Sequence, residues 1–366
     1  MSRFVSPRPH SIRGRRSLWP LLLAAAVAAA ATAPSAAQPA RAAATVVPVA
    51  ARASDLATQA SAPGWRPYSA ASPFNAPLGR LRPSPGSARM VARLLDWSGG
   101  GPGKVVLGGS GTRDDYGHPI YFAAPGDPKV TLHATESWGR NPLDGVRIPV
   151  PQGARAAGGD DEHMTVVTPD GWEYDLWQVH GGGAADARLS FGWGGRVRLD
   201  GDGLGGAATS SGFASMAGII RPQELAAGRI RHALFITSRC TTGFVFPAAK
   251  GGRECATGVD GPPMGAHVAL ALSRARIDRL PVPPWKRAIM RALATYGGYI
   301  GDTGGSGFGV QAESGASWTS FGLEDPFVAF ARDSGLADNG GRYALDLKSG
   351  LDWARHLRVV LPPRRS

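Results

Sequence analysis

The stretch that decides the fold is residues 160–180, DDEHMTVVTPDGWEYDLWQVH. Its middle, residues 168–172, reads Thr-Pro-Asp-Gly-Trp and is a turn signal. Pro169 presets φ, and Gly171 takes the left-handed conformation that closes a three-residue hairpin loop. We therefore expect the residues on either side to form two antiparallel strands.

The loop fixes which side chains share a face, because side chains alternate along a strand with period two. The predicted register pairs Thr168 with Trp172, Val166 with Tyr174, Thr165 with Asp175 and His163 with Trp177. One face then collects apolar side chains: Met164, Val166, Trp172, Tyr174 and Leu176. The other face collects mostly polar ones: Asp161, His163, Thr165, Glu173, Asp175 and Trp177. The first is predicted to face the core, and the second is the candidate site.

A plainer interpretation of the polar face stays open. Antiparallel sheets commonly present one wet face to solvent, and acidic side chains there need have no function. What favours a site is the gathering of acids, an imidazole and an indole on one ribbon.

The first 44 residues have the pattern of a signal peptide. A basic segment precedes the short apolar run 18–33, and alanine-rich stretches that could be cleaved follow. The run is too short to predict a membrane anchor. We expect a secreted protein without stable membrane insertion, in which residues 45–72 are a flexible linker and residues 73–366 form one domain.

The charge of the mature chain is modest. Without the six arginines of residues 1–44, the formal net charge falls from +12 to +6. The remaining basic residues are scattered, which argues against nucleic-acid binding. Cys240 and Cys255 are the only cysteines, and export to an oxidising compartment predicts that they form a disulfide.

Short β-rich runs separated by turn clusters continue through much of the chain, with 51 glycines and 30 prolines in the whole sequence. This spacing predicts a mainly β fold, an antiparallel β-sandwich or jelly roll with a few short helices. The clearest helix is expected over 284–296. A split into two domains near 201–206 is the alternative.

Four segments are similar to a group of secreted bacterial proteins without an assigned activity. They are HALF (232–235), FVFPA (244–248), PPMGA (262–266) and YGGYIGDTGG (296–305). The likeness spans roughly residues 160–310 and implies export.

A second resemblance lies in the hairpin. Residues 173–178, EYDLWQ, are similar to the E-x-D-x-x-E strand of jelly-roll endo-glycanases of the laminarinase and β-glucanase type. That likeness implies that Glu173 is a nucleophile assisted by Asp175. The family's acid/base position holds Gln178 here, so the proton donor is missing from its usual place.

Glycoside cleavage needs two carboxyl groups beside the scissile bond. Glu173 and Asp175 lie two residues apart on one strand, about 6 to 7 Å between Cα atoms, and like charges that close raise one pKa. His163 is the candidate that supplies the proton transfer Gln178 cannot. Asp161, Trp177, Gln178 and Trp193 are the candidate substrate-binding residues, with the indoles stacking on sugar rings.

Other sites receive less support. His163, His180 and His232 with Asp161 offer zinc-ligand types without motif spacing. Asp200 and Asp202 begin like a calcium loop whose other ligands are missing, and no nucleophile-elbow motif is present. We therefore expect no metal and no cofactor.

The sequence thus predicts a secreted glycan-active enzyme, a glycoside hydrolase that cleaves extracellular or cell-envelope polysaccharide. The alternative is a non-catalytic carbohydrate-binding or cell-envelope β-sandwich protein.

Overall fold

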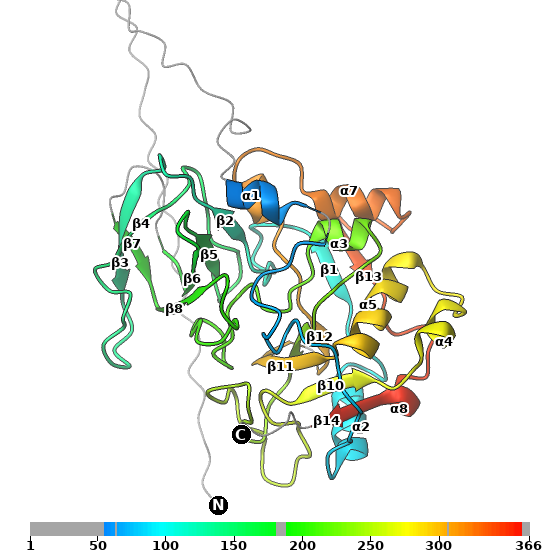
Figure 1. Cartoon of the computed structure of the whole chain (residues 1–366). Helices are drawn as coiled ribbons and strands as arrows, with labels where there is room; N and C mark the ends of the chain where they lie inside the picture. Colours follow the sequence, from blue (N-terminus) through cyan, green and yellow to red (C-terminus); the bar gives the residue numbers. More distant parts are fainter. Residues whose placement is uncertain (1–54, 63, 181–187, 306, 361–366) are drawn as a thin grey trace, which may run out of the picture. The chain divides into compact units, whose positions relative to one another are not determined.

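The computed structural model describes residues 55–62, 64–180, 188–305 and 307–360. The described residues belong to one compact unit (Figure 1). The expected signal peptide lies outside the described residues, as does the first part of the expected linker. None of the helices in the described ranges has the length and apolar composition needed to cross a bilayer.

The described strands are β1 (Val105–Gly108), β2 (Ile120–Phe122), β3 (Lys129–Ala134), β4 (Arg147–Pro149), β5 (Met164–Val167), β6 (Trp172–Trp177), β7 (Arg188–Phe191), β8 (Trp193–Arg198), β9 (Leu234–Ser238), β10 (His267–Leu270), β11 (Gly298–Thr303), β12 (Gly309–Val310), β13 (Arg342–Leu345) and β14 (Leu357–Val360). The described helices are α1 (Asp55–Ala60), α2 (Ser87–Trp97), α3 (Pro222–Ala226), α4 (Arg274–Asp278), α5 (Pro284–Thr295), α6 (Ala316–Thr319), α7 (Pro326–Asp333) and α8 (Trp353–His356).

The described strands form four sheets, with the orders β1-β13, β12-β9-β11-β10-β14, β2-β5-β6-β8 and β4-β3-β7. A mainly β fold is confirmed, but the sheets are mixed. The pairs β2–β5, β3–β7 and β9–β11 are parallel, so the expectation of purely antiparallel pairing is wrong. Parallel pairing needs a long crossover between the strands, and no local signal in the sequence reports the direction in which distant strands meet.

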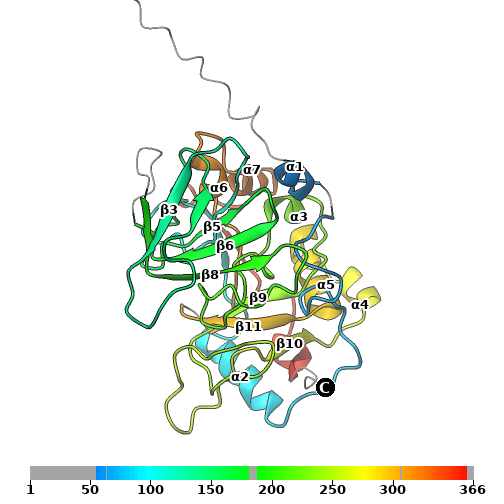
Figure 2. The same ribbon diagram turned by 60° about the vertical axis from the view of Figure 1, so that its left-hand side comes forward.

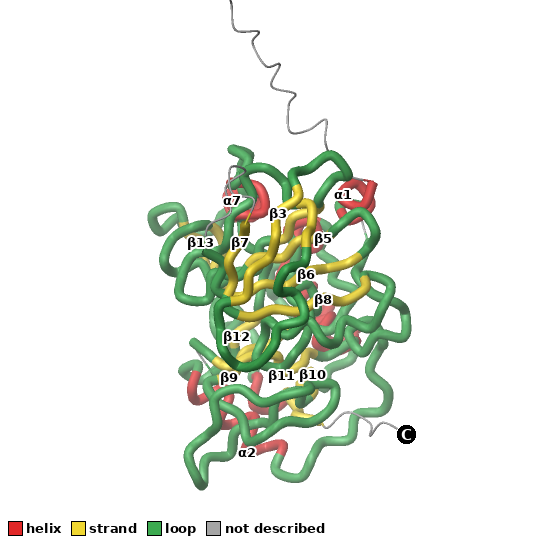
Figure 3. The backbone as a smooth tube through the Cα atoms, turned by 90° about the vertical axis from the view of Figure 1, so that its left-hand side faces the viewer, coloured by secondary structure: helices red, strands yellow, loops and turns green. Residues whose placement is uncertain are grey.

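The hairpin at the centre of the sequence prediction is strands β5 and β6. Its register is confirmed: Thr165 pairs with Asp175 and Val166 with Tyr174. The loop closes as expected, since Gly171 has a φ of 80° and its N–H donates to the Thr168 carbonyl at 2.9 Å. In the views of Figures 2 and 3, β6 is followed by β8 and then by the five-stranded sheet.

Both faces of this hairpin are buried, which the sequence analysis did not predict. Met164, Val166 and Leu176 pack in one core cluster, as expected for the apolar face. On the opposite face, Glu173 and Asp175 have no exposed surface. That face abuts a second and larger core that includes residues of the 213–220 segment, so the four-stranded sheet lies between two cores.

The segment that covers the polar face is rich in glycine for a steric reason. A Cβ on Gly195 of β8 would lie 2.5 Å from the Gly206 carbonyl oxygen, and one on Gly206 would lie 2.4 Å from an oxygen of Asp175. Real Cβ atoms do not approach that closely, so only glycine lets the 203–217 segment pack on the sheet. The close backbone approach displaces the water that a wet face would have held.

The described part of the expected linker is packed rather than free. Residues 55–60 form α1, and Ser72 is fully buried. The Tyr68 hydroxyl donates to Glu173 at 2.7 Å, and the Tyr68 N–H donates to the Leu199 carbonyl. Tyr68 and Ser72 thus tie this part of the chain to the hairpin and to the backbone of Asp202.

The longest described helix follows its sequence signal. Helix α5 starts at Pro284, with a proline in its first turn, and the chain turns at Gly297, whose φ is 71°. Its buried residues Ile289 and Leu293 pack into the larger core. This is the predicted 284–296 helix within one residue.

The disulfide between Cys240 and Cys255 is confirmed, with the two Cα atoms 4.9 Å apart. It closes a loop between β9 and β10 that also has backbone hydrogen bonds between Thr241 and residues 253 and 255. Within this loop lies Lys250, which borders the cavity described below.

The disulfide is expected to contribute to stability. Replacing both cysteines by alanine should lower the free energy of unfolding by about 3 kcal/mol, the scale set by the entropy of a loop of this length. Urea unfolding followed by circular dichroism measures this difference. Reduction of the wild-type protein should reproduce it, whereas reduction of the double variant should change nothing.

Candidate functional site

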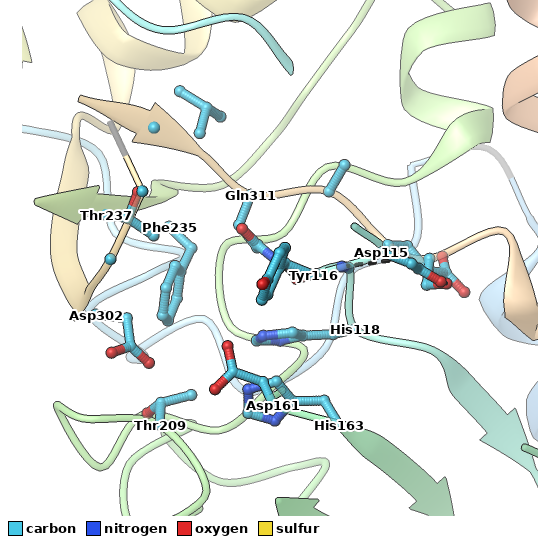
Figure 4. Close-up of a pocket in the computed structure, with 18 of the residues that line it drawn as sticks. Asp115, Tyr116, His118, Asp161, His163, Thr209, Phe235, Thr237, Asp302 and Gln311 are labelled. Atoms are coloured by element: carbon cyan, nitrogen blue, oxygen red, sulfur yellow. Dashed lines mark hydrogen bonds between the residues drawn. The ribbon is translucent and has the colours of Figure 1, made fainter. Parts of the chain in front are cut away.

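The candidate functional site is a cavity of about 770 Å³ that the described residues enclose. Its wall combines segments far apart in the sequence: β1, the 114–118 loop, the start of the hairpin, the 207–210 segment, and the ends of β9 and β11. Figure 4 shows His118, His163, Asp161 and Asp302 facing one space. A cavity of this size with convergent polar groups is typical of a ligand site.

Two histidines whose rings lie against each other at an angle form part of the wall. The rings of His118 and His163 have centroids 4.4 Å apart, and both residues are buried. His118 Nδ1 is 3.0 Å from the Ser215 carbonyl oxygen. Because a carbonyl only accepts, Nδ1 carries the proton and Nε2 keeps its lone pair.

Burial keeps both rings neutral. Desolvation lowers the pKa of His118, and desolvation together with the nearby His118 holds the pKa of His163 well below its usual value. His163 Nδ1 is buried and has no hydrogen-bond partner among the described residues. An unpaired buried nitrogen is costly.

Asp302 lies near the end of β11, on the other side of the same space (Figure 4). The Ser210 N–H and hydroxyl and the Thr303 N–H donate to its carboxylate. Burial nevertheless raises the pKa of Asp302, the three donors oppose that rise, and the charge of Asp161 adds to it. Asp302 is thus a carboxyl group whose protonated form is favoured relative to an ordinary aspartate.

Asp161 precedes β5 and faces both the histidines and Asp302. Its Oδ1 accepts a hydrogen bond of 3.1 Å from the indole N–H of Trp177. Its charge raises the pKa of His118 as well as that of Asp302. The charge of Asp161 therefore reaches Asp302 across the cavity.

Three indoles form an aromatic platform beside Asp161. The rings of Trp138 and Trp177 stack with centroids 5.7 Å apart and planes 26° apart, and Trp138 lies at the same distance from Trp193. Trp177 and Trp193 are cross-strand partners in β6 and β8. Trp138 has 64% of its surface exposed, so one indole face is open at the cavity.

Only some of the site residues predicted from the sequence line the cavity. Asp161, His163, Trp177 and Trp193 line the cavity, whereas Glu173, Asp175 and Gln178 do not. Glu173 accepts hydrogen bonds from Tyr68 and the Met216 N–H, and Asp175 accepts one from Thr165. Both acids are fully buried and lie outside the cavity lining.

The side chains of the alternative metal sites do not come together. His180 pairs with Glu162 and His232 with Glu224, while His163 faces the cavity. Asp200 pairs with Arg198, and Asp202 accepts from the Leu204 N–H as in an ordinary turn. Across the described ranges, no group of three or more His, Cys, Asp or Glu side chains is arranged to hold a metal.

Sequence reasoning missed His118, Trp138 and Asp302. The signal for Asp302 was present in the YGGYIGDTGG segment, where a single acid ends a strand just before a pair of glycines. Trp138 stands alone among polar loop residues, and His118 follows the acids of a turn. Nothing local links the three, because pairing of distant strands brings them together.

No family model, curated protein or solved structure matches this chain.

The buried acids generate a test of their structural role. Burial, then the charge of Asp175, raises the pKa of Glu173 well above its usual value, and burial raises that of Asp175 to about 6. The folded chain therefore binds protons more tightly than the unfolded one. The free energy of unfolding should fall as pH rises from about 4, the unfolded carboxyl value, through 6.

Glu173→Gln should weaken that pH dependence, since the amide does not ionise, and should leave any activity intact. Glu173→Ala should cost about 1–3 kcal/mol by leaving buried donors unpaired. Chemical unfolding at pH 4 to 8 measures both effects. The exposed Glu254→Gln is the control, and an unchanged slope in Glu173→Gln would contradict the assignment.

Proposed function

We propose that this protein is a secreted glycoside hydrolase that cleaves a polysaccharide, with Asp302 and Asp161 as its working carboxyl groups. The observation that supports this most directly is a single cavity that brings two acids beside a platform of three indoles. Sugar rings stack on indole faces, and glycosidic bonds are broken between paired carboxyl groups.

Asp302 is the proposed general acid. It is the acid of the pair whose pKa burial raises, as a proton donor at near-neutral pH requires. It would protonate the leaving glycosidic oxygen as the C–O bond breaks. The Ser210 and Thr303 donors hold its carboxyl group in one orientation.

Asp161 is the proposed ionised partner. The Trp177 indole N–H holds one of its oxygens and so links the carboxylate to the sugar platform. Asp161 would accept the proton of the attacking water, or attack the sugar itself. The anomeric configuration of the first product distinguishes these two routes.

His118 is proposed to position the substrate. Its Nε2 lone pair is left free by the Nδ1 contact with Ser215, so it can accept a hydrogen bond from a sugar hydroxyl or from water. The ring of His163 lies against that of His118 and supports its orientation. Both rings are expected to act as neutral imidazoles.

The exposed apolar surface supports a bound ligand at this place. Of the five large hydrophobic residues exposed in the described part of the chain, Val106, Tyr116 and Trp138 border the cavity. Apolar groups gathered at one opening mark a binding surface more often than scattered ones do. The same platform supports the second candidate, a carbohydrate-binding protein without catalysis.

We also propose that the protein is secreted and that its sheets form a sandwich. The disulfide is compatible with an oxidising compartment. The four-stranded sheet has a core cluster on each face, as an inner layer would have.

The test is to incubate the protein with plant, fungal and bacterial polysaccharides and to measure new reducing ends. Asp302→Asn and Asp161→Asn should each lower an observed rate by about 10²-fold or more while the fold is kept. Asp333→Asn, an exposed aspartate outside the cavity, is the matched control. Binding without new reducing ends would favour the non-catalytic candidate, and activity that survives both variants would contradict the assignment.

The pH profile gives an independent test of Asp302. A general acid must be protonated, so the rate should fall as pH rises through the raised pKa of Asp302. Ser210→Ala removes a hydrogen bond that favours the charged form, which should move this alkaline limb to higher pH. Ser334→Ala, on the surface at the end of α7, should leave the limb in place. A limb that moved to lower pH in Ser210→Ala would contradict the role.

A further inference from the structure

The charges that line the cavity are mostly compensated within the protein. Asp114 accepts from Arg342 at 2.8 Å. Asp115 accepts from two backbone N–H groups and the Ser314 hydroxyl. Asp302 is held by Ser210 and Thr303. These groups have little unused capacity for a ligand charge.

Lys250 is different. Its ammonium donates to the Ala207 carbonyl at 3.1 Å, and no carboxylate among the described residues lies within ion-pair distance of it. An ammonium has three N–H donors, so the others remain for a ligand. Both Lys250 and Ala207 line the cavity.

Lys250 lies near the reacting groups. Partial desolvation lowers the pKa of Lys250, and the charge of the nearby Asp302 opposes part of that fall. Lys250 is exposed at the cavity, where an anion can pair with its charge. Asp302 does not fill that role well, because its oxygens are already bound by other donors.

The backbone around Lys250 is fixed. The Ala249 N–H donates to the Ser211 carbonyl at 2.9 Å. The Cys240–Cys255 disulfide closes the loop that carries Ala249 and Lys250. Lys250 is therefore presented beside the 207–211 segment that also holds Asp302. A cation positioned this way can select among substrates.

We propose that the glycan cleaved at this site is a uronate-containing polysaccharide and that Lys250 binds a sugar carboxylate next to the scissile bond. This inference rests on the proposed function and names its substrate class. A neutral glycan would leave the ammonium without a counter-charge, whereas a carboxylate would accept its free N–H groups. Lys104, a second cation on the cavity wall, adds to the positive potential that an acidic chain meets.

The test compares short oligosaccharides in matched pairs. Oligomers of galacturonate, glucuronate and mannuronate are each titrated beside the same oligomer with its carboxyl groups reduced to alcohols, using calorimetry at fixed ionic strength. The wild-type protein should bind at least one uronate about tenfold more tightly than its neutral partner, the scale of one charge-assisted hydrogen bond. Lys250→Gln should abolish this preference and Lys250→Arg should retain most of it.

Lys129→Gln, an exposed lysine of β3 away from the cavity, controls for general loss of positive charge. Thermal unfolding checks that each variant is folded. The inference is wrong if no uronate binds better than its neutral partner, or if Lys250→Gln keeps the preference. A sulfated neutral oligomer bound as tightly as the uronates would also contradict it, because any anion would then suffice.

Failure of this inference is separable from failure of the proposed function. Cleavage of neutral glycans that depends on Asp302, with no uronate preference, would keep the function and remove the substrate class. A Lys250-dependent uronate preference without new reducing ends would keep the recognition and remove the catalysis.

Discussion

The structure depends on the packing of a glycine-rich segment against the polar face of the β5–β6 hairpin. Residues 203–217 lie so close to β6 and β8 that a methyl group at Gly195 or Gly206 would overlap its neighbours. Two carboxyl groups are sealed beneath this contact, and Glu173 binds both Tyr68 and the Met216 N–H. One buried acid therefore joins three parts of the chain: the 64–75 segment, the central hairpin and the covering segment.

That contact also forms the cavity. Once the covering segment is fixed by Glu173 and Gly206, its 207–210 part lies along the cavity wall, where Ser210 holds Asp302. Ser215 of the same segment fixes the tautomer of His118. Glu173 and Asp175 are buried outside the cavity lining, whereas Asp161 and Asp302 line the cavity.

The sequence predicted what local physics determines. The Pro-Asp-Gly loop and the alternation of side chains were enough for the hairpin register, and two prolines followed later by a glycine pair were enough for α5. The burial of the polar face was not predictable in this way. A face open to water and a face covered by a distant segment have the same alternation of polar and apolar side chains along the strand. Of the residues that line the cavity, Asp161, His163, Trp177 and Trp193 belong to or adjoin the hairpin, whereas His118, Trp138 and Asp302 reach it from other segments.

The pairing of β1 with β13 has a consequence for the order in which the chain folds. Val105 is the partner of Leu345, and Val268 of β10 is the partner of Val359. Each of these pairs joins residues far apart in the sequence, so the entropy cost of closing a long loop comes before the pair contributes any stability. Folding that depends on such pairs is slow. The larger core contains residues of both β1 and β14, so it is complete only when the last strands have been synthesised. A chain that emerges from its N-terminus must stay partly unfolded until then, although elements with strong local signals, such as the hairpin, can form earlier.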